Sequence, residues 1–134
     1  MAKENVEVVR DQYAATNERD FKRVMSHYAE DVELVVHGQG IRAGTFKGRD
    51  AVGRWFGDWF SSFDHDARFE VKELAELEEE SVLVAADHHA RGRASGVEVH
   101  GVFVWLYRLR QAKIIRVDGY ASRDEALAAV GLSE

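Results

Sequence analysis

The longest regular alternation of side chains in this sequence runs from Ser81 to Leu109. Residues alternate with a period of two in two arms, 82–87 and 97–109, which is typical of β-strands whose two faces differ in environment. Gly92 and Gly96 lie between the arms and supply the permissive backbone that a chain reversal needs. The pattern predicts a long antiparallel hairpin. Each arm has about a dozen residues against an average strand of five or six, so the arms must bend over other elements.

Helical spacing predicts three helices before this hairpin. Between Glu4 and Asn17, apolar residues recur three and four positions apart, and Asp20 is a suitable N-cap for a short second helix. Two short helices with so few residues between them should pack as a helical hairpin. A third helix follows Lys47–Asp50, with an apolar face formed by Val52, Trp55, Phe56, Trp59, Phe60 and Phe63.

The remaining segments predict short strands and one terminal helix. Strands are expected at 32–36, 68–76 and 113–120, with a glycine-containing loop from His37 to Phe46. A short helix should run from 123 to 129 and end at Gly131. Helices followed by a meander of strands indicate an α+β fold, in which a curved sheet wraps around the helices and leaves a concave, mostly apolar cavity.

Composition excludes several classes of function. The 134 residues are 46% hydrophobic, within the globular range and enough for a single domain over 1–134. The chain has no cysteine, which excludes disulfides and thiolate metal sites, and its net charge of −6 argues against nucleic-acid binding. No apolar run approaches the ~20 residues of a membrane span, and Met1–Glu4 does not begin a signal peptide. A cytoplasmic protein is therefore expected.

Several short segments occur in an order that resembles a known superfamily: Val8–Arg10 with Tyr13, Asn17–Phe21, Tyr28–Val32, Phe46–Val52, Gly92–Val97, and Lys113–Val117 with Tyr120. Together they resemble the nuclear transport factor 2 superfamily, in its SnoaL-like, ketosteroid-isomerase-like branch, over about Asn5 to Leu132. The resemblance implies a cone-shaped, strongly curved antiparallel or mixed sheet around N-terminal helices (a cystatin-like roll) and a homodimer across the sheet. It does not imply a reaction, because the fold hosts isomerases, cyclases, dehydratases, epoxide hydrolases and non-enzymes.

The catalytic residues of ketosteroid isomerases do not carry over to this sequence. A gap-free match places Gln12 where they have a tyrosine, Val36 at the general base, and Trp105 near the protonated aspartate. Steroid isomerisation is therefore not expected. The His/Asp pair of the similar polyketide cyclases would fall near Trp105 and near Asp118 or Gly119, so only Asp118 could match.

His88 is the best candidate for a general base. His88 and His89 are adjacent in a predicted strand and must point to opposite faces, and the residue matching places His88 inward. In an apolar cone it could act as a base, with Tyr13 or Tyr28 as hydroxyl donor and Asp118 as orienting acid. The alternatives are a neutral core histidine or dimer contact, and a salt bridge from Asp118 to an arginine on the outer face.

Core-facing aromatic residues predict a site for a small apolar or aromatic molecule, although plain core filling is the alternative. The expected ligand-binding residues are Tyr13, Tyr28, His37, Trp55, Trp59, Trp105, Val117 and Tyr120. His100 lies close to opposite His89, near Asp87, but two histidines with no third ligand at readable spacing do not predict a metal site. No cofactor is expected.

Two hypotheses of function remain. In the first, the chain is a cofactor-independent isomerase, cyclase or dehydratase that uses general acid–base chemistry. In the second, it is a non-catalytic ligand-binding or dimeric interaction module. They differ in geometry, because an enzyme needs a titratable group and a donor that converge on one point in the cavity.

Overall fold

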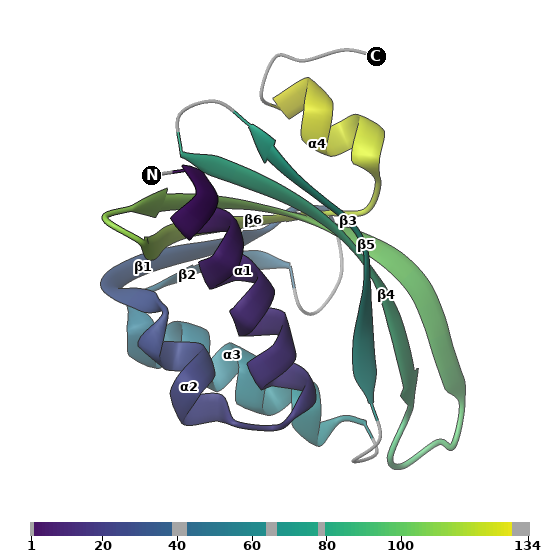
Figure 1. Cartoon of the computed structure of the whole chain (residues 1–134). Helices are drawn as coiled ribbons and strands as arrows, with labels where there is room; N and C mark the ends of the chain where they lie inside the picture. The colour runs from purple at the N-terminus through teal and green to yellow at the C-terminus, as the bar shows by residue number, and fades with distance from the viewer. Residues whose placement is uncertain (1, 39–42, 64–66, 78–79, 130–134) are drawn as a thin grey trace.

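Six strands form one strongly curved, mixed sheet in the order β2-β1-β6-β5-β4-β3 (Figure 1). The computed structural model describes residues 2–38, 43–63, 67–77 and 80–129. Neighbouring strands are antiparallel except for β1 and β6, which run parallel. The elements, in chain order, are α1 (Ala2–Asn17), α2 (Phe21–Ser26), β1 (Tyr28–Val36), β2 (Gly44–Lys47), α3 (Arg49–Ser61), β3 (Arg68–Leu77), β4 (Ser81–Arg91), β5 (Glu98–Arg110), β6 (Lys113–Tyr120) and α4 (Arg123–Ala129).

The long hairpin predicted from the alternation is confirmed as β4 and β5. The two strands pair without a register shift, from Ser81 opposite Arg108 to Arg91 opposite Glu98. Gly96 has a φ of 71°, in the left-handed region that glycine adopts readily. Because side chains alternate along each strand, one set of hairpin residues faces the helices and the other set faces away from them.

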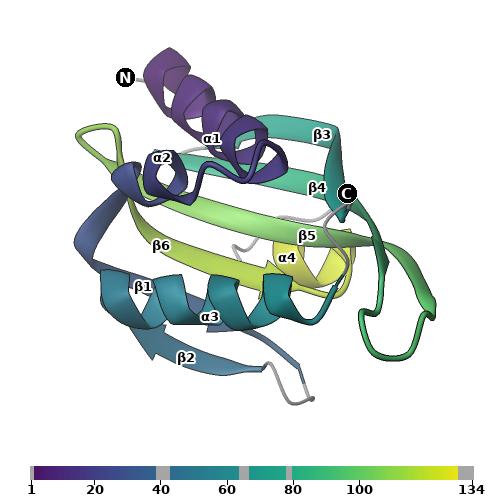
Figure 2. The same cartoon turned by 90° about the horizontal axis from the view of Figure 1, so that it is seen from below.

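Helices α1, α2 and α3 cover the concave face of the sheet (Figure 2). The predicted cap of α2 is confirmed, because the Asp20 carboxylate accepts a hydrogen bond from the backbone N–H of Arg23 at 3.2 Å. The core between these helices and the sheet contains fully buried side chains from every layer, among them Val9, Val24, Val32, Val52, Val84 and Ile114. None of the described helices has the length and apolar character needed to span a membrane.

A second, smaller core lies on the opposite, outer face of the sheet. There α4 packs its Ala126 and Leu127 against side chains of β4 and β5. The strand residues that it covers are Leu83, Ala85, Val104 and Leu106. The helices are therefore not confined to one face, and α4 leaves the hairpin uncovered toward its turn (Figure 1).

Two local predictions differ from the structure. Strand β1 begins at Tyr28, four residues before the predicted Val32, and β2 lies within the segment predicted to be a loop. β2 is a short edge strand that pairs with β1 from Lys47 opposite Glu33 to Gly44 opposite Val36, so its hydrogen bonds, not an apolar pattern of its own, define it. Residues 39–42 of that predicted loop and the helix stop at Gly131 lie outside the described residues.

Candidate functional site

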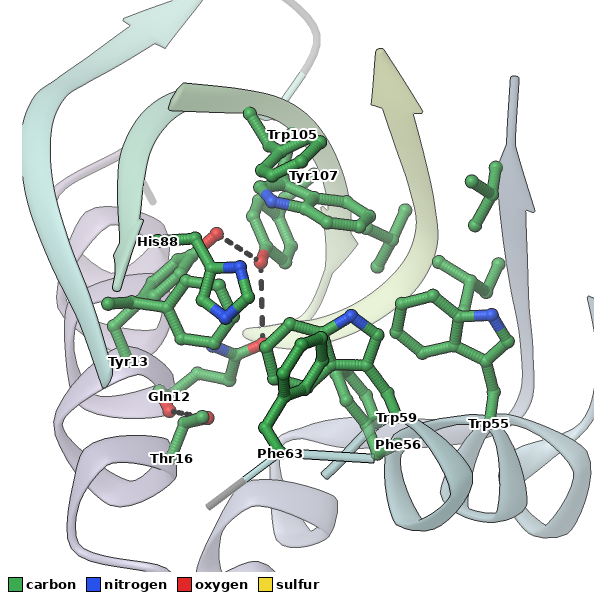
Figure 3. Close-up of a pocket in the computed structure, with 15 residues that line it drawn as sticks. Gln12, Tyr13, Thr16, Trp55, Phe56, Trp59, Phe63, His88, Trp105 and Tyr107 are labelled. Atoms are coloured by element: carbon green, nitrogen blue, oxygen red, sulfur yellow. Dashed lines mark hydrogen bonds between the residues drawn. The ribbon is translucent and has the colours of Figure 1, made fainter. Parts of the chain in front are cut away.

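A cavity of about 270 Å³ lies between the helices and the concave face of the sheet (Figure 3). Helices α1 and α3 form one wall, and strands β1, β3, β4, β5 and β6 form the other. Its lining is mostly aromatic and aliphatic: Gln12, Tyr13, Thr16, Leu34, Val36, Trp55, Phe56, Trp59, Phe63, Phe69, His88, Phe103, Trp105, Tyr107 and Val117.

The aromatic wall follows from two simple periodicities. Trp55 and Trp59 are one turn apart on α3, and both therefore face the sheet. Trp105 and Tyr107 are two residues apart on β5 and share its concave face. Trp55 meets Trp105 edge to face with ring centroids 6.2 Å apart, and these contacts between rings hold the wall in place.

His88 is the basic group among the described residues that line this cavity. Its side chain comes from β4 and points into the cavity among aromatic rings, with its centroid 4.4 Å from Trp59 and 5.0 Å from Phe69 (Figure 3). Its Nε2 is buried and has no hydrogen-bond partner within the described part of the chain. Burial, with a smaller contribution from the neighbouring His89, lowers the pKa of His88 to about 4 despite the opposing effect of the Asp87 carboxylate. The imidazole is therefore neutral at pH 7.

A chain of hydroxyl groups ends at the side chain of Gln12. The Tyr107 hydroxyl donates to the Tyr13 hydroxyl at 2.8 Å and lies 3.4 Å from Gln12 Oε1. The Tyr28 hydroxyl also donates to Gln12 Oε1, and the Thr16 hydroxyl donates to the backbone carbonyl of Gln12 at 2.7 Å. Burial raises the pKa values of all three tyrosines, so they stay protonated and can donate hydrogen bonds.

The structure brings together six of the sequence-predicted site residues. Tyr13, Trp55, Trp59, His88, Trp105 and Val117 all line the cavity. Tyr28, also predicted to bind the ligand, is fully buried behind the lining, where its hydroxyl donates to Gln12 and its ring packs against Phe56.

Asp118, His37 and Tyr120 belong to the outer face of the sheet, so the prediction that they help to form the cavity is wrong. Val117 lines the cavity, and alternation along β6 turns Asp118 away from it. His37 Nε2 lies 2.8 Å from Asp118 Oδ1, and its ring stacks on Tyr120. Burial opposes ionisation of Asp118, but hydrogen bonds from Arg116 and His37 hold its pKa below the usual value. The alternative interpretation, a salt bridge to an arginine, is therefore the correct one for Asp118.

Sequence reasoning missed several lining residues, although a signal for some of them existed. Gln12 and Val36 were not among the expected ligand-binding residues, yet both line the cavity, and the residue matching places them at catalytic positions of ketosteroid isomerases. The residue matching therefore located the cavity, although these positions carry different residue types from those of ketosteroid isomerases. Phe69 and Tyr107 could have been found by extending the alternation of β3 and β5 to the concave face.

A family model for the SnoaL-like domain matches residues 9–117. The chain belongs to the SnoaL-like domain family. This match covers most of the sequence, from within α1 to within β6, and includes all of α3 with its aromatic residues. No curated protein matches this SnoaL-like chain in a sequence search.

Solved structures share the NTF2-like, ketosteroid-isomerase-like fold of this SnoaL-like protein. Bal32a, from a soil-derived mobile gene cassette, aligns with a TM-score of 0.82 and 21% identity over 89% of each chain. TerC, co-crystallised with polyporic acid, aligns with a TM-score of 0.76 and 21% identity over 96% of this chain and 97% of its own. RV0760c from Mycobacterium tuberculosis, in complex with estradiol-17beta-hemisuccinate, aligns with a TM-score of 0.78 and 16% identity over 90% and 95%.

Proposed function

We propose that this SnoaL-like protein binds a small, largely apolar, ring-bearing molecule in the cavity beneath α1 and α3. The observation that carries this proposal is a cavity of about 270 Å³ walled by aromatic rings, into which His88 Nε2 points without a hydrogen-bond partner among the described residues. This volume is that of about nine water molecules at ~30 Å³ each. It lies close to the lower end of the range of volumes found for ligand pockets and suits a molecule of one or two rings.

His88 defines the polar end of the proposed ligand. A buried polar group without a hydrogen bond costs about 1–3 kcal/mol, and a ligand hydroxyl or carbonyl near Nε2 removes that cost. A neutral imidazole nitrogen donates or accepts according to its tautomer, so either kind of group fits. The ligand therefore combines a flat apolar body with a single polar substituent.

The structural neighbours support a binding role. TerC was crystallised with polyporic acid and RV0760c with estradiol-17beta-hemisuccinate, so this fold accepts organic ligands in at least two proteins. At 21% and 16% identity, these two neighbours support only a shared fold. The ligand class proposed here rests on the lining residues of this chain.

Cofactor-independent acid–base catalysis, such as isomerisation, dehydration or cyclisation, is the second candidate. It is favoured by the placement of His88 and the hydroxyls of Tyr13 and Tyr107 around one cavity (Figure 3). In that case His88 is the base and Tyr13 the hydroxyl donor. Against it stands the low pKa of His88, because a base is most effective when its pKa is near the working pH. Binding without catalysis is therefore the first candidate.

Paired fragments test the binding role. Each pair consists of one ring scaffold with and without a hydroxyl or carbonyl group, and affinity is measured by calorimetry after a thermal-shift screen. We expect the polar member to bind more tightly. The substitution His88→Phe should raise the Kd of the polar member about tenfold, which corresponds to ~1.4 kcal/mol for one hydrogen bond. The Kd of the apolar member should not change.

His37→Gln is the matched control, because it removes a histidine that lies on the outer face. It should leave both affinities unchanged. Binding of neither member, or equal losses in both histidine variants, contradicts the proposal. Solvent deuterium exchange next to the carbonyl of a bound fragment, catalysed by the wild type and abolished in His88→Phe, would instead favour the acid–base candidate.

A further inference from the structure

A second polar cluster lies on the outer face of the sheet, on the side opposite the cavity. It consists of Asp87, His89 and His100 and is called the outer cluster below. Asp87 and His89 flank the inward-pointing His88 on β4, so alternation sends both outward. His100 lies directly opposite His89 on β5. The cluster sits between the turn of the hairpin and the region that α4 covers.

The outer cluster gathers three metal-binding donor atoms. Asp87 Oδ2 lies 3.4 Å from His89 Nε2 and 3.0 Å from His100 Nε2. The two imidazole rings stack with centroids 4.5 Å apart and planes 26° apart. One donor atom from each residue falls within 4.8 Å of the other two. The register of the hairpin thus supplies the third ligand that the spacing in the sequence did not reveal.

One of the two oxygens of the Asp87 carboxylate lacks a hydrogen bond from the described residues around it. Asp87 is 8% exposed, and its Oδ1 is buried without a hydrogen bond from any described residue. His100 Nε2 lies 2.9 Å from Oδ1, but only its contact with Oδ2 has hydrogen-bond geometry. On the neighbouring strand, the carboxylate of Glu70 is paired with Lys72 at 2.8 Å. A buried acceptor without a donor favours a bound cation at this position.

We propose that the outer cluster binds a divalent transition-metal ion, and that zinc is the ion that its donor set suits best. Zinc holds imidazole nitrogen and carboxylate oxygen at about 2.0–2.2 Å with tetrahedral geometry, which places neighbouring ligand atoms about 3.4 Å apart. The contacts of Asp87 with the two histidines, 3.0 and 3.4 Å, are close to this separation. Magnesium and calcium prefer sites made of oxygen atoms, so two imidazoles disfavour them.

The exposure of the outer cluster determines what the metal does there. The side chain of His100 is 64% exposed, so the ion is accessible from solvent and water fills the fourth position. The ligands come from both arms of the hairpin, two from β4 and one from β5. The metal therefore ties the two arms together near their turn, in a site separate from the proposed ligand cavity.

Zinc titration of the tag-free, EDTA-treated and dialysed protein tests this proposal. ZnCl₂ is the probe, and calorimetry should show one saturable site per chain. His100→Asn removes one exposed ligand and should weaken binding at least tenfold, because even the loss of a supporting residue around a metal costs 10–100-fold. Substituting Co²⁺ for zinc should give the intense visible absorption of a tetrahedral site in the wild type and not in the variant.

His37→Gln is the matched control for the titration. His37 also contacts a single aspartate on the outer face, Asp118, but among the described residues that pair belongs to no group of three ligands. This variant should bind zinc with wild-type affinity. A wild type without a saturable site, or equal affinity in His100→Asn and wild type, overturns the proposal and leaves the cluster as an aspartate hydrogen-bonded to His100 and in polar contact with His89. Far-UV circular dichroism checks that each variant is folded.

Discussion

At the scale of single residues, the position of Trp105 depends on the glycine opposite it. Gly119 on β6 pairs with Trp105 on β5, and a Cβ atom at Gly119 would lie 2.5 Å from the indole ring. The absence of a side chain lets the indole lie against β6, where it forms part of the cavity wall. Gly119 therefore supports the site without lining it.

Gly119→Ala should displace the indole of Trp105 and destabilise the fold. Contacts this short force a shift of the ring or of the backbone, and overpacking of this kind typically costs 1–3 kcal/mol. The measurement is urea unfolding followed by tryptophan fluorescence. Gly101→Ala on β5 is the control, because a Cβ there meets no atom within 4 Å. Equal midpoints for the two variants would show that Trp105 does not depend on the close approach at Gly119.

His88 and Asp118 show how far sequence reasoning reaches at this scale. Alternation along a strand separates His88 from His89 correctly, but it gives no absolute direction, and only the residue matching placed His88 inward. For Asp118, the same alternation places the side chain on the outer face once Val117 is known to line the cavity. The pKa of about 4 for His88 follows from the rings that bury it, and those come from α3, from Phe63 just after it, from β3 and from β5. Such tertiary burial has no local signature in the sequence.

At the scale of secondary-structure elements, an ion-pair network ties α1 to α2 and to the residue after it. The carboxylate of Asp11 accepts hydrogen bonds from the Arg23 guanidinium and lies 2.7 Å from His27 Nε2. The hydrogen bond from Arg23 contributes most, and that from His27 next, to a pKa of Asp11 well below its usual value. The network fixes the turn between the helices that the sequence predicted.

Replacing Asp11 by Asn should reveal how much this ion-pair network stabilises the fold, because the stability difference from wild type should depend on pH. A carboxylate whose pKa is lower in the folded state stabilises it above the unfolded pKa of about 3.9, and this stabilisation is lost as the pH falls through the folded value. The side chain is 38% exposed, so solvent screening keeps the effect near 0.5–1 kcal/mol. Thermal unfolding should show Asp11→Asn less stable than wild type at pH 7. The difference should shrink at the lowest accessible pH, and a constant difference would contradict the role of the charge.

The elements with strong internal patterns were predictable, whereas those defined by partners were not. The hairpin, the N-cap at Asp20 and the apolar face of α3 each follow from residues within one segment. Strand β2 exists because the edge of β1 offers it hydrogen bonds, and its four residues carry no apolar alternation. The outer position of α4 likewise depends on Leu83 and Leu106, which lie far from it in the sequence.

At the scale of the whole molecule, the sheet separates two chemically different faces. Its concave face, with the helices, encloses an aromatic cavity whose polar groups are neutral. Its outer face carries α4, the ion pair of Arg116 with Asp118, and the outer cluster. Val102 is paired with Asp87 and is 49% exposed, so an apolar side chain lies in solvent on this outer face. The single chain thus leaves the uncovered half of the hairpin available for contact.

We expect a second copy of the chain to cover this face, as the homodimer implied by the family resemblance. Light scattering at micromolar concentration should give twice the chain mass of 15.2 kDa. The outer cluster lies beside Val102, so the measurement is made both with EDTA and with one equivalent of zinc. A dimer under both conditions would mean that the sheet surfaces alone hold the two copies together. A dimer only with zinc would make the metal the link between them, and one chain mass under both conditions would contradict the dimer.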